Sequence, residues 1–169
     1  MNRRNARSLI QTAAGLVGLT FLLVGIAGFI PGITTNLYDG LEFAGHDGDA
    51  ELLGIFQVSV LHNLVHLLFG VAGLSLARTA DGSRLFLIGG GATYLLLWIY
   101  GLVIDLDSGA NFVPLNDADN WLHFGLGVAM VGLGIALSRG VRAPARARKP
   151  EGFQDQSEPR GAFKRSGGG

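Results

Sequence analysis

The sequence contains no cysteine and few charged residues. The absence of cysteine excludes disulfide bonds, thiolate metal sites and cysteine nucleophiles. Only 15% of the 169 residues are charged, whereas a water-soluble domain has about 25%. Hydrophobic residues make up 49% of the chain, so this deficit indicates that much of the chain faces lipid rather than water.

Long runs without charged residues predict the membrane spans. A span needs about 20 apolar residues, because the hydrocarbon core is about 30 Å thick and a helix rises about 1.5 Å per residue. We therefore expect an all-α integral membrane protein, a four-helix bundle built from two repeated transmembrane hairpins. The transmembrane domain covers residues 9–138, with spans at about 9–30, 52–77, 85–104 and 121–138.

Basic residues are missing from two of the three segments that connect these spans. Residues 31–51 and 105–120 contain no Lys or Arg, and all 13 basic residues lie in the other connection or outside the spans. Because basic residues favour the cytoplasmic side, we expect a multi-pass protein of the cell membrane. Its N-terminus (residues 1–8) and its C-terminus are then cytoplasmic, and the acidic loop at residues 39–51 lies outside.

The C-terminal segment, residues 139–169, is polar and rich in Gly, Arg and Pro. It has too little apolar surface to order itself, so we expect a disordered cytoplasmic tail. Its first basic residues are expected to meet anionic lipid headgroups. They are Arg139, Arg142, Arg146, Arg148 and Lys149. Nucleic-acid binding is not expected, since neither interleaved aromatic residues nor a folded module accompanies the charge.

The two halves of the chain resemble each other. Gly18-Leu19-Thr20-Phe21 matches Gly91-Ala92-Thr93-Tyr94, and Asn63-Leu64-Val65-His66 matches Asn120-Trp121-Leu122-His123. The paired Thr, Asn and His residues make chance a weak explanation, and they predict a duplicated hairpin with a pseudo-two-fold axis along the membrane normal. Small residues spaced four apart predict tight helix crossings within the bundle. These pairs are Ala14/Gly18, Gly125/Ala129 and Gly132/Ala136.

Polar side chains inside a membrane are energetically costly, so each needs a partner or a function. Ser59, His62, Asn63 and His66 recur at i, i+3, i+4 and i+7, which places them on one helix face. The repeat sets Asn120 and His123 opposite them. We expect one interior polar cluster, made of Ser59, His62, Asn63, His66, Asn120, His123 and Asp105.

Three interpretations of this cluster are open. In the first, the side chains hydrogen-bond across helices and lock the two hairpins together, with no cofactor. In the second, His66 and His123 bind a haem b or a metal ion. In the third, the histidines and Asp105 line a proton or cation path, and the protein is a small transport component.

Catalytic motifs are missing from the sequence. There is no Walker loop, no G-x-S-x-G and no H-E-x-x-H. His62 and His66 have the spacing of a zinc-protease helix, but Asn63 stands where the catalytic Glu would be. We therefore expect a non-enzymatic protein that acts through lipid, a membrane partner or a homo-oligomer.

Two long runs resemble a known family. Residues 53–73 (LGIFQVSVLHNLVHLLFGVAG), together with residues 111–116 (NFVPLN) and 118–123 (ADNWLH), are similar to the family DUF4383. The resemblance covers about residues 8–137. It implies a four-span bacterial membrane protein of unassigned function, and it carries over no catalytic or binding residue.

Overall fold

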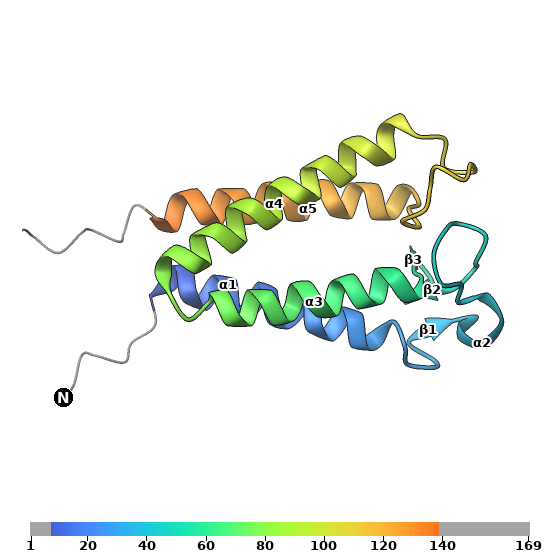
Figure 1. Cartoon of the computed structure of the whole chain (residues 1–169), viewed down its shortest axis with the longest axis horizontal. Helices are drawn as coiled ribbons and strands as arrows, with labels where there is room; N and C mark the ends of the chain where they lie inside the picture. Colours follow the sequence, from blue (N-terminus) through green and yellow to red (C-terminus); the bar gives the residue numbers. More distant parts are fainter. Residues whose placement is uncertain (1–7, 139–169) are drawn as a thin grey trace, which may run out of the picture.

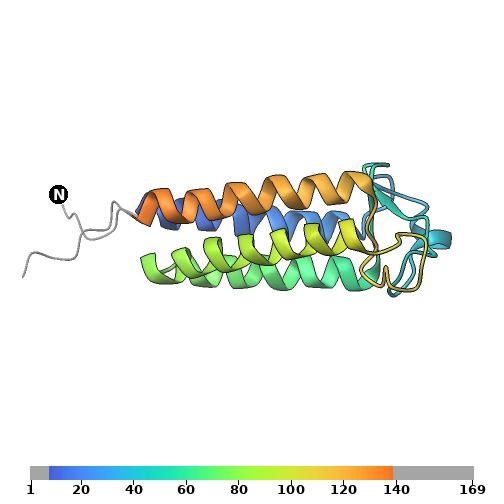
Figure 2. The same ribbon diagram turned by 90° about the horizontal axis from the view of Figure 1, so that it is seen from above.

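The computed structural model describes residues 8–138, which form four long helices lying side by side, with a small cap at one end (Figures 1 and 2). The helices are α1 (Leu9–Ala27), α3 (Val60–Leu76), α4 (Ala80–Val103) and α5 (Asp117–Ser138). Helix α1 packs against α3 and α4 packs against α5, while contacts between the two pairs are sparser. The residues expected at the lipid surface, Arg139, Arg142, Arg146, Arg148 and Lys149, lie outside the described residues.

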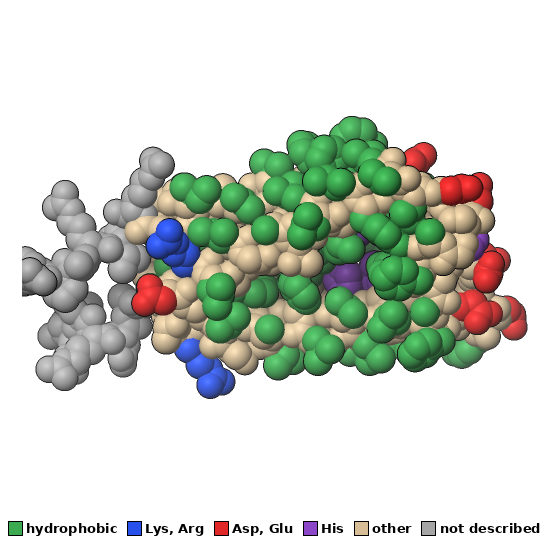
Figure 3. All heavy atoms as spheres, turned by 45° about the horizontal axis from the view of Figure 1, so that its top comes forward, with side chains coloured by type: hydrophobic (Ala, Val, Ile, Leu, Met, Phe, Trp, Pro, Cys, Tyr) green, Lys and Arg blue, Asp and Glu red, His purple; other side chains and the backbone are tan. Residues whose placement is uncertain are grey.

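The helices have the length and the surface of membrane helices. Helices α1, α4 and α5 are long and apolar enough to cross a membrane, and α3 is a shorter apolar helix of 17 residues. Large hydrophobic side chains are exposed along their sides, whereas acidic side chains gather at the capped end (Figure 3). A surface of this kind is stable in lipid and not in water, so the protein is embedded in a membrane.

Polar side chains cap the N-termini of the helices, where backbone N–H groups have no partner inside the helix. Ser59 Oγ accepts a hydrogen bond from the backbone N–H of His62 at 3.1 Å, which starts α3. Thr79 Oγ1 accepts from the N–H of Gly82 at 3.0 Å and starts α4. Asn116 Oδ1 accepts from the N–H of Asp119 at 2.9 Å in the first turn of α5.

The predicted start of the second span, at residue 52, was wrong. Residues before α3 form a small antiparallel sheet in the order β1-β2-β3, from β1 (Thr34–Thr35), β2 (Glu51–Leu52) and β3 (Phe56–Gln57), and a short helix α2 (Leu37–Gly40) lies beside it. Leu52 and Val58 of this segment are buried with Ala50 in a small core, whereas Leu53 and Ile55 are exposed. These apolar residues therefore belong to the cap and not to a longer helix.

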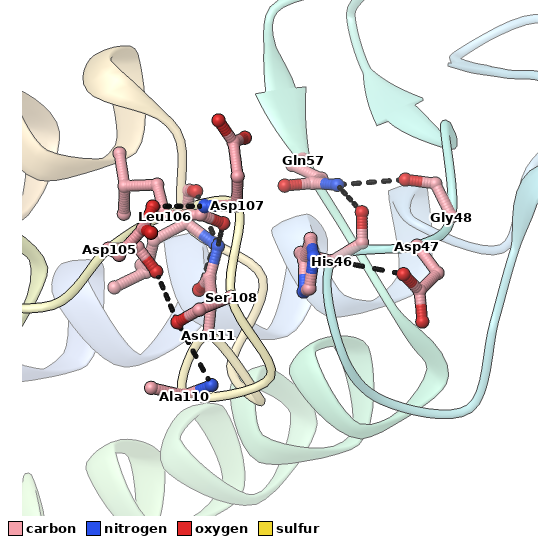
Figure 4. A network of polar contacts seen from close by, with 11 residues as sticks. His46, Asp47, Gly48, Gln57, Asp105, Leu106, Asp107, Ser108, Ala110 and Asn111 are labelled. Carbon is pink, nitrogen blue, oxygen red and sulfur yellow. Dashed lines mark hydrogen bonds and ion pairs between the residues drawn. The ribbon is translucent and has the colours of Figure 1, made fainter.

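Side-chain amides hold the loops of the cap in place (Figure 4). Gln57 Nε2 donates to the carbonyl oxygens of His46 and Gly48, at 3.0 and 2.8 Å, and so fixes the acidic loop. In the loop that follows α4, Asn111 Nδ2 donates to the carbonyls of Leu106 and Leu115, both at 3.0 Å.

Glycines permit close backbone contact within each helix pair. A Cβ on Gly18 of α1 would lie 2.8 Å from the backbone nitrogen of Leu74 in α3. A Cβ on Gly91 of α4 would lie 2.9 Å from the carbonyl oxygen of Gly127 in α5. Both distances are shorter than a van der Waals contact, so only glycine allows these crossings.

Two of the predicted small-residue contacts were wrong. Ala14 and Gly18 are buried as expected. The stripe formed by Gly125, Ala129, Gly132 and Ala136 is exposed along α5. The buried face of α5 instead uses Gly127 and Gly134, two residues further along the helix. In a lipid-facing helix both faces are apolar, so spacing alone does not separate the interior stripe from the exterior one.

Candidate binding cavity

A cavity of about 270 Å³ lies near the capped end, among α3, α4 and α5. Its walls are mostly apolar, formed by Leu61, Val65, Phe69, Leu97, Phe112 and Val113. Figure 3 shows histidine side chains at the bottom of a hollow on the apolar side of the molecule. Three of the four histidines of the chain, His62, His66 and His123, line the cavity.

Tyr94 of α4 joins these histidines. Its hydroxyl oxygen lies 3.3 Å from Nε2 of His66, across the boundary between the two helix pairs. Its ring meets the imidazole of His123 edge-on, with ring centroids 5.0 Å apart. On its other side the ring stacks on Phe21 of α1, at 5.3 Å and 26°. Tyr94 is therefore the buried centre on which residues of all four long helices converge.

The hydrogen bonds of His66 indicate which of its nitrogens carries the proton. Nδ1 lies 3.0 Å from the carbonyl oxygen of His62, one turn earlier, and a carbonyl can only accept. Nδ1 is therefore the protonated nitrogen of the neutral ring, and Nε2 is an acceptor. Tyr94 then donates its hydroxyl proton to Nε2, and its own oxygen keeps lone pairs for another donor. The His62 ring stacks on the His66 ring at 4.3 Å and 11°.

His123 is buried and lacks a partner. The residue is 4% exposed, and its Nδ1 makes no hydrogen bond within residues 8–138. A neutral imidazole has one donor and one acceptor nitrogen, and a buried polar group without a partner costs about 1–3 kcal/mol. Most buried polar groups in proteins have a partner, so Nδ1 of His123 is an unexplained polar atom in the lining of the cavity.

The first interpretation of the cluster expected the two asparagines to lock the hairpins together, and this expectation was wrong. Asn63 Nδ2 donates to the carbonyl of Gly28 at 2.9 Å, at the end of α1. Asn120 Nδ2 donates to the carbonyl of Gly101 in α4 at 3.2 Å. Each bond joins two helices of one pair. The bond that crosses between the pairs involves Tyr94, which is not in the predicted cluster.

The remaining members of the predicted cluster lie in different places. Ser59 is buried, and it caps α3 rather than lining the cavity. Asp105 is exposed in the turn after α4, where its Oδ1 accepts from the N–H of Asp107 at 3.1 Å. It neither lines the cavity nor meets a histidine, so its predicted place in the cluster was wrong. A carboxylate that stands at the end of a span reaches water at little cost, which burial arguments from sequence do not anticipate.

A haem held between His66 and His123 does not fit this arrangement. Each coordinating nitrogen would have to lie about 2 Å from one metal atom. Tyr94 contacts both imidazoles, so a porphyrin reaches both only if the tyrosine leaves. Within the part of the chain that is described, no three His, Cys, Asp or Glu side chains are placed to hold a metal ion jointly.

Sequence reasoning missed Tyr94 and the loop residues Phe112 and Val113. The signal for Tyr94 was present, since the repeat aligns it with Phe21 and these two rings stack on each other. The loop residues carry no polar signal, and only the folding of the loop over α3 brings them to the cavity.

The comparisons with known proteins agree with the resemblance noted above. The sequence model of a family described as a domain of unknown function, DUF4383, matches residues 11–136. The match includes all four long helices except their outermost residues, together with the cap and the cavity. Comparisons with curated proteins and with solved structures give no match.

Proposed function

Since this chain belongs to the DUF4383 family, whose function is unknown, we propose a function from the geometry of the cavity. The protein is a non-enzymatic membrane protein that binds a small apolar molecule dissolved in the bilayer. The molecule enters sideways between α3 and α4. The observation that carries this proposal is a cavity with apolar walls and a histidine floor, open on the lipid-facing side of the molecule.

The architecture in this proposal is a four-helix bundle made of two repeated hairpins. Equivalent hydrogen bonds support the repeat, since Asn63 and Asn120 each bind a glycine carbonyl of the preceding helix. Arg78 lies in the turn between α3 and α4, and Arg84 lies near the start of α4. Basic side chains lie at the end opposite the acidic cap (Figure 3), which supports a cytoplasmic location for that end. The cavity then lies in the outer half of the membrane.

The composition of the cavity supports binding rather than a structural role alone. Ligand sites are mostly apolar concave surfaces with a few convergent polar groups, and ionisable residues at membrane depth are functional by default. Here three imidazoles and one phenol share one apolar hollow. Among the buried side-chain atoms of residues 8–138 that lack a hydrogen-bond partner, Nδ1 of His123 is the one whose residue lines the cavity.

The aromatic packing beneath the cavity argues against the alternative of a proton or cation path. Phe21 packs edge-on against Phe69 and Phe86, which are tilted relative to each other, with ring centroids 5.8 to 6.5 Å apart. This cluster lies between the histidines and the end of the bundle that carries Arg78. A conducting path needs water or polar side chains there, and these rings provide neither.

Photolabelling in liposomes tests the proposal. A long-chain alkane bearing a diazirine, dissolved in the bilayer, is expected to label peptides of α3 and α4 at the cavity after irradiation. Leu97→Trp fills the cavity and should abolish that labelling. Leu96→Trp, at a position that is 66% exposed on the same helix, is the matched control and should leave it intact. Equal labelling in the two variants would refute cavity binding.

A further inference from the structure

The chemistry of the cavity also restricts what it binds, and this inference rests on the proposed function. We infer that the ligand is an uncharged amphiphile with a hydroxyl group, either an aliphatic alcohol or a phenol. The hydroxyl group hydrogen-bonds to His123 and Tyr94, while the apolar part leaves through the side opening into the bilayer. An anionic lipid headgroup or an ammonium group is not accepted.

The absence of charge in the lining excludes charged ligands. The residues that line the cavity include no Lys, Arg, Asp or Glu. An ionised group in an apolar site without a counter-charge is strongly unfavourable, since desolvation outweighs the hydrogen bonds that neutral partners offer. Carboxylates, phosphates and ammonium groups therefore stay at the membrane surface.

The free hydrogen-bonding groups of the cavity suit a group that both donates and accepts. The Tyr94 hydroxyl gives its proton to His66, so its oxygen is left to accept. In His123, Nδ1 is unpaired but sealed from the cavity, so Nε2 is the nitrogen that remains for a ligand in the cavity. The hydroxyl of Thr93 donates to the carbonyl of Gly89 at 3.0 Å, so it too can only accept. A hydroxyl group can donate to the Tyr94 oxygen and also bond Nε2 of His123, whereas an ether or a ketone can only accept.

The size of the cavity indicates that only the head of the ligand enters. Its 270 Å³ is about nine times the roughly 30 Å³ that a water molecule occupies in the liquid. Complete small-molecule sites are about 300–1,000 Å³. A ring or a short chain segment therefore fills the cavity, and the rim residues Val65 and Phe112, which are 42% and 56% exposed, contact the part that remains in lipid.

The experiment compares probes that differ only at the polar end. Four diazirine probes are used in phosphatidylcholine liposomes: a long-chain alcohol, its methyl ether, the carboxylic acid of the same chain, and an alkyl phenol. The alcohol, the phenol or both should label the cavity peptides about tenfold more than the ether and the acid, which is the change expected for one buried hydrogen bond. The relative labelling by the alcohol and the phenol tells which source of the hydroxyl is preferred.

Two variants test the residues that recognise the hydroxyl. His123→Leu should lower labelling by the hydroxyl probes to the level of the ether and leave the ether unchanged. His46→Leu, in the cap and outside the cavity, is the matched control and should change nothing. Tyr94→Phe removes one hydroxyl without changing the ring, and should reduce the preference for hydroxyl probes over the ether several-fold. This variant keeps the test decisive even if His123→Leu fails to fold.

The outcomes separate this inference from the proposed function. If the alcohol, the ether and the acid label the cavity equally, or if the acid labels it best, the hydroxyl inference is overturned and cavity binding stands. If none of the probes responds to Leu97→Trp, the proposed function itself is overturned. Selective labelling that His123→Leu leaves unchanged would show that the hydroxyl is recognised elsewhere, and would also overturn the inference.

Discussion

Replacing Gly101 by alanine should destabilise the protein strongly, although alanine is the better helix former. Gly101 lies inside α4, and a Cβ there would overlap the side-chain amide of Asn120. The carboxamide must then move, and its hydrogen bond to the Gly101 carbonyl is lost. A buried unpaired group costs about 1–3 kcal/mol and overpacking about 1–3 kcal/mol, while the gain in helix propensity is about 1 kcal/mol. The net loss of unfolding free energy is about 1–5 kcal/mol.

Gly89→Ala on the same helix is the matched control. No atom lies within 4 Å of a Cβ at Gly89, so this change should be neutral or should stabilise by up to about 1 kcal/mol. Unfolding free energies in mixed micelles, measured by denaturant titration, give the comparison. The reasoning also predicts that Asn120→Ala partly rescues Gly101→Ala, with a coupling of at least about 1 kcal/mol, because the methyl group then occupies the space of the amide. Equal stability of Gly101→Ala and Gly89→Ala, or additive single effects in the double variant, would refute it.

Three further predictions concern the cap, the helix crossing and the orientation. Asp119 is buried and its Oδ2 accepts from the backbone N–H groups of Gln57 and Asn116, both at 3.1 Å. Asp119→Ala should therefore lower unfolding free energy by about 2–4 kcal/mol, while Asp117→Ala, an exposed site, should stay within about 0.5 kcal/mol. Gly18→Ala should cost about 1–3 kcal/mol in the same titration, because α1 and α3 must separate; a neutral result would contradict the tight crossing. The chain has no cysteine, so a single cysteine in place of Asp47 in the cap or Asp81 at the start of α4, both exposed, reports sidedness. An impermeant maleimide applied to whole cells should label the first and not the second, and the reverse pattern would invert the predicted topology.

The sequence predicted the helices well because membrane depth imposes a simple rule. Backbone groups in lipid must be satisfied within the segment, so long apolar runs at 9–30, 85–104 and 121–138 have to be helical. The same rule failed at residues 52–59, since a short apolar segment in a folded cap is as hydrophobic as a span. Ser59 was the better signal there, because its side chain caps α3.

The inward orientation of the histidines also followed from the sequence, because imidazole and amide groups are too costly against acyl chains. His62, Asn63, Asn120 and His123 are all buried, and His66 is half-buried. The hydrogen-bond partners of these groups could not be predicted from the sequence. Spacing and repeat suggested bonds between the hairpins, whereas Asn63 and Asn120 bind glycine carbonyls within them.

The sequence by itself determined that this chain enters a membrane, where three of its four long helices lie, and that its histidines and asparagines at membrane depth must turn inward. These are properties of single segments, because the low polarity of lipid acts on each segment independently of the others. The tertiary structure alone decided that Gly18 faces a partner helix while Gly125 does not, and that Tyr94 contacts both His66 and His123. It also decided that a loop closes one end of the cavity. Every face of an apolar helix is acceptable to lipid, so only the shapes of neighbouring helices determine which face is buried and where a cavity remains.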